Sequence, residues 1–351
     1  GFVIGLKLPC IVFGTGLCFA FFGVSGPFRR RFMLSFIFGL GILAGIAITY
    51  GYWGWFLGHH FSNPMFPYFN DFFKSPLAPL SSARDVQFLP RSAHDFLLFP
   101  FIFTDSPFRT GEIPWRDWRI LILYVLLPLA LLARLGFGRS KQNSDALARP
   151  SAARYLLWAA VISYFLWALM FAIYRYLVPL EMLAPLLIVL AIGMLPLKLQ
   201  TRGLIAAFIL IVIAASIQGG NWSRRASWSD YFIETGVPAL GKTSDLMILM
   251  AGFDPYSHVI PQFPPDIAFV RIQSNFTSPD QNKGMNAVLH ARVEAHKGRY
   301  MLLIAGWQKK QAAEALGYYH LALAPGPCQT VVDHLYGDTP LDLCQVTRLN
   351  Q

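Results

Sequence analysis

The sequence predicts an α-helical polytopic membrane domain, residues 1–219, followed by a small α/β domain, residues 220–351. Hydrophobic residues make up 55% of the chain and charged residues only 14%, whereas a soluble domain carries roughly a quarter charged residues. Several uncharged stretches reach the roughly 20 apolar residues that a spanning helix needs. From residue 218 onward the composition changes, because eleven basic and eleven acidic residues make this tail neutral.

The apolar stretches predict spans near 33–57, 119–134, 155–174, 177–197 and 203–219. The opening run, 1–24, fits either one full span or two half-helices, because Lys7 and Pro9 interrupt it. It begins with Gly1 inside an apolar run, so we expect further membrane segments upstream. Segment 58–118 is too apolar for a solvated loop and too rich in proline for a span. We expect it to lie along the outer membrane surface.

The basic residues predict how these spans are oriented. Ten cations occupy three loops with a single acid, Asp145; they are Arg29, Arg30, Arg31, Arg134, Arg139, Lys141, Arg149, Arg154, Lys198 and Arg202. Excess Lys and Arg in alternate short loops is typical of the cytoplasmic side of membrane proteins and not of a nucleic-acid-binding stripe. Segment 58–118, the turn 174–181 and the tail therefore face outward.

The tail has the pattern of a small α/β domain. Short apolar runs at 245–252, 267–273 and 299–306 predict buried strands, and 284–298 and 309–320 have helical spacing. An oxidising outer compartment permits a disulfide between Cys328 and Cys344, 16 residues apart; two unpaired thiols are the alternative. No spacing typical of a metal site is present.

The turn 174–181 carries the most informative charges. Arg175 and Glu181 lie six residues apart in an otherwise apolar segment, where a charge is costly and needs compensation. Arg175 could pair with Glu181, extend to the membrane surface, or hold a phosphate at headgroup depth. Lys74 offers a second positive charge for a phosphate. The other polar groups expected near this face are Tyr174, Tyr176, Asn63, Asn70 and Asp71.

Three stretches, "GLKLP" (5–9), "NPMFPYFNDFFKSP" (63–76) and "YRYLVPLEML" (174–183), resemble bacterial C-type membrane glycosyltransferases. The resemblance covers most of residues 1–217. It implies transfer of a sugar from a polyprenyl-phosphate carrier to an envelope acceptor at the bacterial inner membrane, with the tail periplasmic. Arg175 matches the arginine of the family's "RY-x-x-P" motif, which implies phosphate binding, and Lys74 matches less closely.

The resemblance does not supply a complete active site. The family's catalytic acidic residue belongs to its first outer loop, which we expect upstream of Gly1, so no catalytic base is assigned. A requirement for a divalent cation stays open, and no other cofactor is implied. Two alternatives remain, a transporter of lipid-linked glycans and a non-catalytic membrane protein of envelope assembly.

Overall fold

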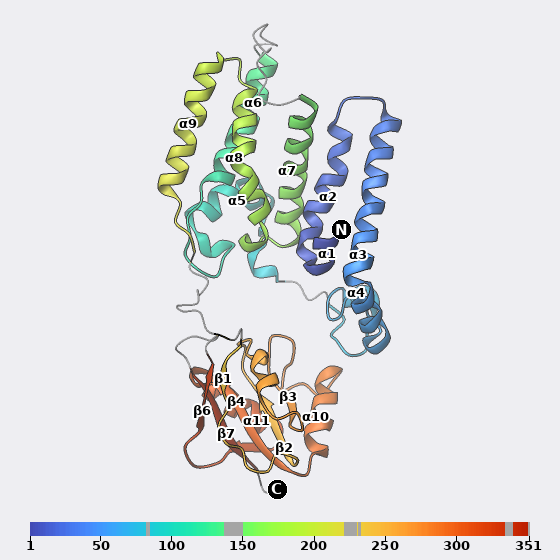
Figure 1. Cartoon of the computed structure of the whole chain (residues 1–351), viewed down its shortest axis with the longest axis vertical. Helices are drawn as coiled ribbons and strands as arrows, with labels where there is room; N and C mark the ends of the chain where they lie inside the picture. Colours follow the sequence, from blue (N-terminus) through green and yellow to red (C-terminus); the bar gives the residue numbers. More distant parts are fainter. Residues whose placement is uncertain (82–84, 137–149, 221–229, 231–232, 334–339, 350–351) are drawn as a thin grey trace. The chain divides into compact units, whose positions relative to one another are not determined.

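The computed structural model describes the chain except residues 82–84, 137–149, 221–229, 231–232, 334–339 and 350–351. It has a helical N-terminal region followed by a C-terminal domain with a mixed sheet, as the sequence predicts (Figure 1). The chain divides into two units, 1–68 with 82–222 and 69–81 with 223–351. Segment 69–81, which we expected to belong to the loop of the membrane domain, thus packs with the C-terminal unit.

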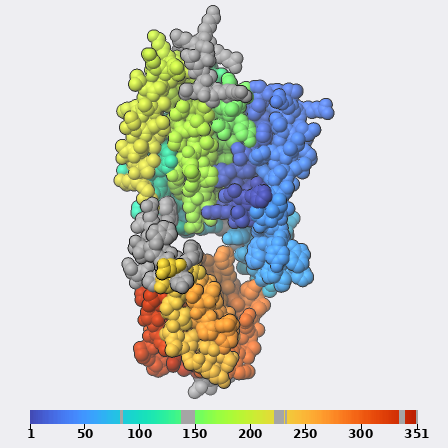
Figure 2. Space-filling model, viewed as in Figure 1, coloured from blue at the N-terminus to red at the C-terminus, as the bar shows by residue number. Residues whose placement is uncertain are grey.

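The helical unit contains eight α-helices among its described residues: α1 (Phe2–Leu6), α2 (Ile11–Ala20), α3 (Phe28–Phe61), α5 (Ala93–Asp105), α6 (Arg119–Gly136), α7 (Pro150–Met170), α8 (Val178–Gly193) and α9 (Leu199–Ser216). Of these, α3, α6, α7 and α9 are long and apolar enough to cross a membrane. The helix α8 is apolar but shorter. The space-filling view shows α8 and α9 side by side on one face (Figure 2).

The opening run consists of two short helices that run in opposite directions. Lys7 is extended, with φ −145° and ψ 97°, and separates α1 from α2. A Cβ added to Gly45 of α3 would lie 2.6 Å from the Gly1 Cα, and one added to Gly5 would meet Thr49. These contacts make α1 parallel to α3, whereas Cys18 of α2 bonds to Ser35 near the opposite end of α3. The opening run therefore forms two short helices and not one continuous helix.

One helix of the expected surface segment contributes aromatic side chains to the protein core. Helix α5 starts at an N-cap, Ser92, whose hydroxyl accepts the main-chain N–H of Asp95. Its side chains Phe99 and Phe103 are fully buried against Trp167 of α7. These two rings pack within the helical unit, whereas Phe101 and Phe108 of the same segment are exposed. The position of segment 58–118 along a membrane surface stays a prediction. Aromatic rings of this size bury more apolar area against other helices than a surface position allows.

Two of the basic loops meet at the end of the helical unit where α3 begins. Arg31 donates to the main-chain oxygen of Phe22, and Arg154 donates to the Ser25 hydroxyl. Arg202 is buried and donates to the carbonyl oxygens of Leu197 and Gly193, where α8 ends. A cation at a helix C-terminus satisfies carbonyls that have no partner within the helix. The predicted loop cations Arg139, Lys141 and Arg149, and the acid Asp145, lie outside the described residues.

The C-terminal unit is built on one mixed sheet. Its strands are β1 (Thr235–Gly236), β2 (Leu246–Met250), β3 (Ala268–Arg271), β4 (Arg299–Ala305), β5 (Leu321–Leu323), β6 (Gln329–Asp333) and β7 (Leu341–Arg348). They are ordered β1-β6-β7-β4-β2-β3, and β5 also pairs with β7. Strand β2 is parallel to β3 and β4, whereas β7 is antiparallel to β4. The three predicted strands and the two predicted helices, found as α10 (Met285–Ala295) and α11 (Lys309–Gly317), are confirmed.

Both faces of the central strands are buried. Leu249 and Leu302 face a core closed by α10 and α11, and Ile248 and Leu303 face a second core that contains Tyr256. This alternation follows from the two-residue period of a strand. Cys344 of β7 forms a disulfide with Cys328, which restricts the unfolded chain and stabilises the domain by about 3 kcal/mol.

Segment 69–81, with the short helix α4 (Asn70–Phe73), attaches to the start of α10. The Met285 N–H donates to the carbonyl oxygen of Leu77 over 3.0 Å. Gly284 has φ +57°, and a Cβ there would lie 3.0 Å from that same carbonyl oxygen. Glycine thus permits both the backbone conformation and the close approach of the segment.

The contact between α1 and α3 predicts different effects for two glycines of α3. In Gly45→Ala the new methyl group would meet main-chain atoms of Gly1 and Phe2, so we expect a loss of about 1–3 kcal/mol in stability from overpacking. Gly41→Ala is the matched control, because a Cβ there meets nothing within 4 Å. It should be neutral or slightly stabilising. Thermal unfolding in detergent measures both, and equal effects would contradict the packing described.

Candidate functional site

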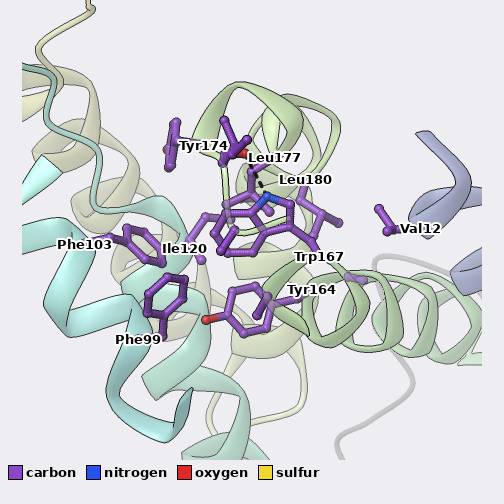
Figure 3. Close-up of a cluster of buried hydrophobic side chains, with 14 of the residues drawn as sticks. Val12, Phe99, Phe103, Ile120, Tyr164, Trp167, Tyr174, Leu177 and Leu180 are labelled. Carbon is purple, nitrogen blue, oxygen red and sulfur yellow. Dashed lines mark hydrogen bonds between the residues drawn. The ribbon is translucent and has the colours of Figure 1, made fainter. Parts of the chain in front are cut away.

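The functional side chains of the helical unit gather where α7 turns into α8. After Met170 the N–H groups of Phe171 and Ala172 both donate to the carbonyl oxygen of Trp167. Ala172 has φ +52° and reverses the chain direction. The Trp167 indole N–H then donates to the Ile173 carbonyl oxygen over 2.9 Å, which holds the reversed segment against α7 (Figure 3).

A short 3₁₀ helix, η5 (Tyr174–Tyr176), follows this reversal. Such a helix has three residues per turn, so consecutive side chains point about 120° apart. Tyr174 is buried, Arg175 is exposed and Tyr176 is half-buried. The "YRY" triplet therefore sends one side chain into the core and presents its neighbour outside.

Beneath η5 lies a buried ionic network that we call the Arg119 network, consisting of Asp117, Arg119, Tyr174 and Glu181. Arg119 Nε lies 3.0 and 2.9 Å from the two Asp117 carboxylate oxygens. Its Nη2 donates to the Glu181 carboxylate, and its Nη1 donates to the Glu181 main-chain oxygen over 3.1 Å. The side chains of Asp117 and Arg119 are only 5% and 15% exposed. The guanidinium therefore joins the start of α6 to the start of α8.

Tyr174 completes this network. Its hydroxyl donates to an Asp117 carboxylate oxygen over 2.9 Å. Burial raises the pKa of Tyr174 far above its usual value, and the negative charges of Asp117 and Glu181 raise it further. The hydroxyl consequently stays protonated as a donor. The Trp115 ring stacks on Tyr174 with ring centres 3.6 Å apart, which fixes the Tyr174 ring from the other side.

Two cations meet on the exposed side of η5. The Lys7 ammonium and the Arg175 guanidinium each lie 5.4 Å from the centre of the Tyr176 ring. Because they share this ring, the two charges are no more than about 11 Å apart. Glu112 forms an ion pair with Arg175 at 3.2 Å, and the two side chains are 49% and 46% exposed. Lys7, Arg175, Tyr176 and Glu112 are called the Tyr176 face, and its net charge is +1.

The structure separates the residues that the sequence analysis grouped. Glu181, one of the candidate partners of Arg175, pairs with Arg119. Lys74, Asn70 and Asp71 belong to segment 69–81 of the other unit. The role of Lys74 as a second phosphate-binding cation thus stays a prediction.

The two asparagines proposed as supporting groups shape their own loops. The Asn63 amide donates to the Tyr68 carbonyl oxygen, and its side-chain oxygen accepts from the Met65 N–H. The Asn70 amide likewise bonds to main-chain groups of the segment that follows it, including Ser75. Both side chains are fully buried. Such bonds are characteristic of asparagine in tight turns, so the structure shows a local structural role for both.

Sequence reasoning missed Lys7, Glu112, Asp117 and Arg119 as members of these two constellations. Asp117 and Arg119 lie two residues apart, and an apolar run follows them directly. This pattern indicates an ion pair at the start of a helix. Their partner Glu181 is 62 residues away from Arg119 in the sequence. A contact between residues so far apart leaves no pattern in the local sequence. Lys7 was noted as an interruption of the opening run and as part of the stretch "GLKLP", but it was given no role in a site.

The Arg119 network and the Tyr176 face differ in what they can bind. The Arg119 guanidinium is surrounded by two carboxylates and is mostly buried, so it serves to hold the fold together. The Arg175 guanidinium is nearly half exposed and engages one exposed carboxylate. An exposed planar fork of donors beside an ammonium group suits a phosphate or carboxylate ligand. The Tyr176 face is therefore a candidate site for an anion.

The Arg119 network predicts a large difference between two arginines. Arg119→Met leaves the buried Asp117 carboxylate without its cation, so we expect a loss of about 3–5 kcal/mol in stability. Arg175→Met removes an exposed pair and should cost about 0–1 kcal/mol. Thermal unfolding in detergent compares the two variants. A second variant that replaces Asp117, Arg119 and Glu181 together by apolar residues should recover part of the loss, and equal stabilities for the two single variants would contradict this assignment.

No family model, no curated protein sequence and no solved structure matches the chain.

Proposed function

We propose that this chain is the phosphate-binding part of an integral membrane glycosyltransferase. In this proposal the Tyr176 face binds the phosphate of a polyprenyl-phosphate-linked sugar, and the sugar passes to an acceptor of the bacterial cell envelope. The observation that carries it is the meeting of Lys7 and Arg175 on one aromatic ring. The two residues come from "GLKLP" and "YRYLVPLEML", stretches that are distant in the sequence and both similar to the same enzyme class.

The position of the Tyr176 face supports a ligand at membrane-surface depth. Arg175 lies between the apolar helices α7 and α8, and Lys7 lies between α1 and α2. The basic residues Arg31 and Arg154 lie at the opposite ends of these helical hairpins. If those clusters face the cytoplasm, as the positive-inside pattern predicts, the Tyr176 face lies at the outer, periplasmic surface.

The chemistry assigned to this face is electrostatic. When a sugar leaves its lipid carrier, negative charge develops on the departing phosphate, and two fixed cations stabilise that charge. Glu112 lowers the cost of holding two cations together while the site is empty, and a phosphate displaces it from Arg175. The face is proposed to bind and stabilise the phosphate; it is not assigned the removal of a proton from the acceptor.

Binding of a polyprenyl phosphate in detergent tests this proposal. Arg175→Ala removes charge-assisted hydrogen bonds to phosphate and should weaken binding about 10- to 100-fold. Lys7→Ala should weaken it less, because a lysine acts as a single point charge. Binding of the uncharged polyprenol should be unaffected by either change.

Arg116→Ala is the matched control for this experiment, because Arg116 is another exposed arginine that immediately precedes Asp117. It should bind the polyprenyl phosphate as the wild type does. Equal affinities of wild-type protein and Arg175→Ala for the phosphate would overturn the proposal. Equal weakening by Arg116→Ala would show a diffuse charge effect in its place.

A further inference from the structure

We propose that a groove between α6 and α7 binds an ester-linked acyl chain of a glycerolipid, at a site separate from the Tyr176 face. The groove has a volume of about 320 Å³, which lies at the lower end of the range for small-molecule sites, roughly 300–1,000 Å³. Its walls include Leu127 and Leu131 of α6 and Leu157 and Val161 of α7. All are aliphatic, so the groove suits a hydrocarbon chain and not a headgroup.

One polar group distinguishes this groove from an ordinary lipid-facing surface. Tyr164 lines it, is only 8% exposed, and has a buried hydroxyl that finds no hydrogen-bond partner among the described residues. Its ring packs against Trp167 and Tyr124, and Figure 3 shows the hydroxyl directed away from Trp167. A buried hydroxyl without a partner costs about 1–3 kcal/mol, so a bound acceptor would recover this free energy.

The depth of Tyr164 identifies the kind of acceptor. Tyr164 lies six residues before Met170, the last residue of α7, which is about 9 Å along the helix axis. In a glycerolipid the ester carbonyl is the polar atom at the top of an otherwise apolar chain. An acyl chain in the groove can therefore place this carbonyl beside the Tyr164 ring, and in this proposal a shift of the Tyr164 side chain about its Cα–Cβ bond brings the buried hydroxyl to it.

This chemistry favours an ester-linked chain over the polyprenyl chain of the proposed donor. A prenyl chain contains only carbon and hydrogen below its phosphate, so it offers no acceptor to Tyr164. The polar residues at the end of the groove also do not suit the phosphate of the donor. Ile120 and Leu180 line the groove and adjoin Arg119 and Glu181 in the sequence. Because that guanidinium is held by two carboxylates, the network does not attract a phosphate.

Competition between two lipids tests the site. The full chain in detergent is given equal amounts of a phosphatidylglycerol with two ester-linked chains and its ether-linked analogue of the same chain length. Bound lipid is then counted by native mass spectrometry. The analogue lacks the carbonyl, so wild-type protein should retain the ester lipid roughly threefold to tenfold more than the ether lipid. Tyr164→Phe should reduce this ratio to about one.

Three further variants make the result specific. Tyr155→Phe is the matched control, because it removes a hydroxyl from the same helix that donates to Leu17 and does not line the groove; its ratio should match the wild type. Leu131→Trp fills the groove from a position already 46% exposed and should reduce retention of both lipids. Arg175→Ala should leave the ratio unchanged, which separates this site from the proposed phosphate site.

The proposal is overturned if wild-type protein retains the two lipids equally, or if Tyr164→Phe keeps the preference for the ester. Unchanged retention of both lipids by Leu131→Trp would also overturn it, because the groove would then not hold a chain.

Discussion

The arrangement of the helical unit depends on one buried guanidinium. Arg119 holds Asp117 before α6 and Glu181 at the start of α8, and Tyr174 donates to the same Asp117 carboxylate. In an apolar environment such a network is stable only when every charge has a partner, because an unpaired buried charge is far more costly than the pair. The network therefore fixes where α8 begins, and with it the short helix η5 that presents Arg175.

The functional proposal is a consequence of this constraint. With Tyr174 held in the core, the three-residue turn of η5 directs Arg175 outward and Tyr176 toward Lys7. Lys7 reaches the same ring because α1 packs closely on α3 through Gly45. A structural cluster and the proposed anion-binding face thus share one short turn, and the different burial of Arg119 and Arg175 separates their roles.

Much of the fold could be predicted because long apolar helices and buried strands leave local patterns in the sequence. A lipid environment requires long apolar helices, and α3, α6 and α9 follow that pattern directly. The site was harder to predict. Glu181 was paired with Arg175 because the two are close in sequence, whereas the 62-residue separation of Arg119 from Glu181 leaves no such signal. Phe99 and Phe103 were misplaced for a similar reason, since apolar composition alone does not tell a lipid-facing ring from a buried one.

The central claim is that the Arg119 network positions Arg175 beside Lys7, and cross-linking tests it most directly. Cysteines replace Lys7 and Arg175 in a full chain whose native Cys10 and Cys18 are changed to alanine, and bifunctional thiol reagents of graded length are added to membranes. The account predicts rapid cross-linking that slows markedly when Arg119→Met is introduced. Absence of the cross-link, or an equal rate with Arg119→Met, would contradict it.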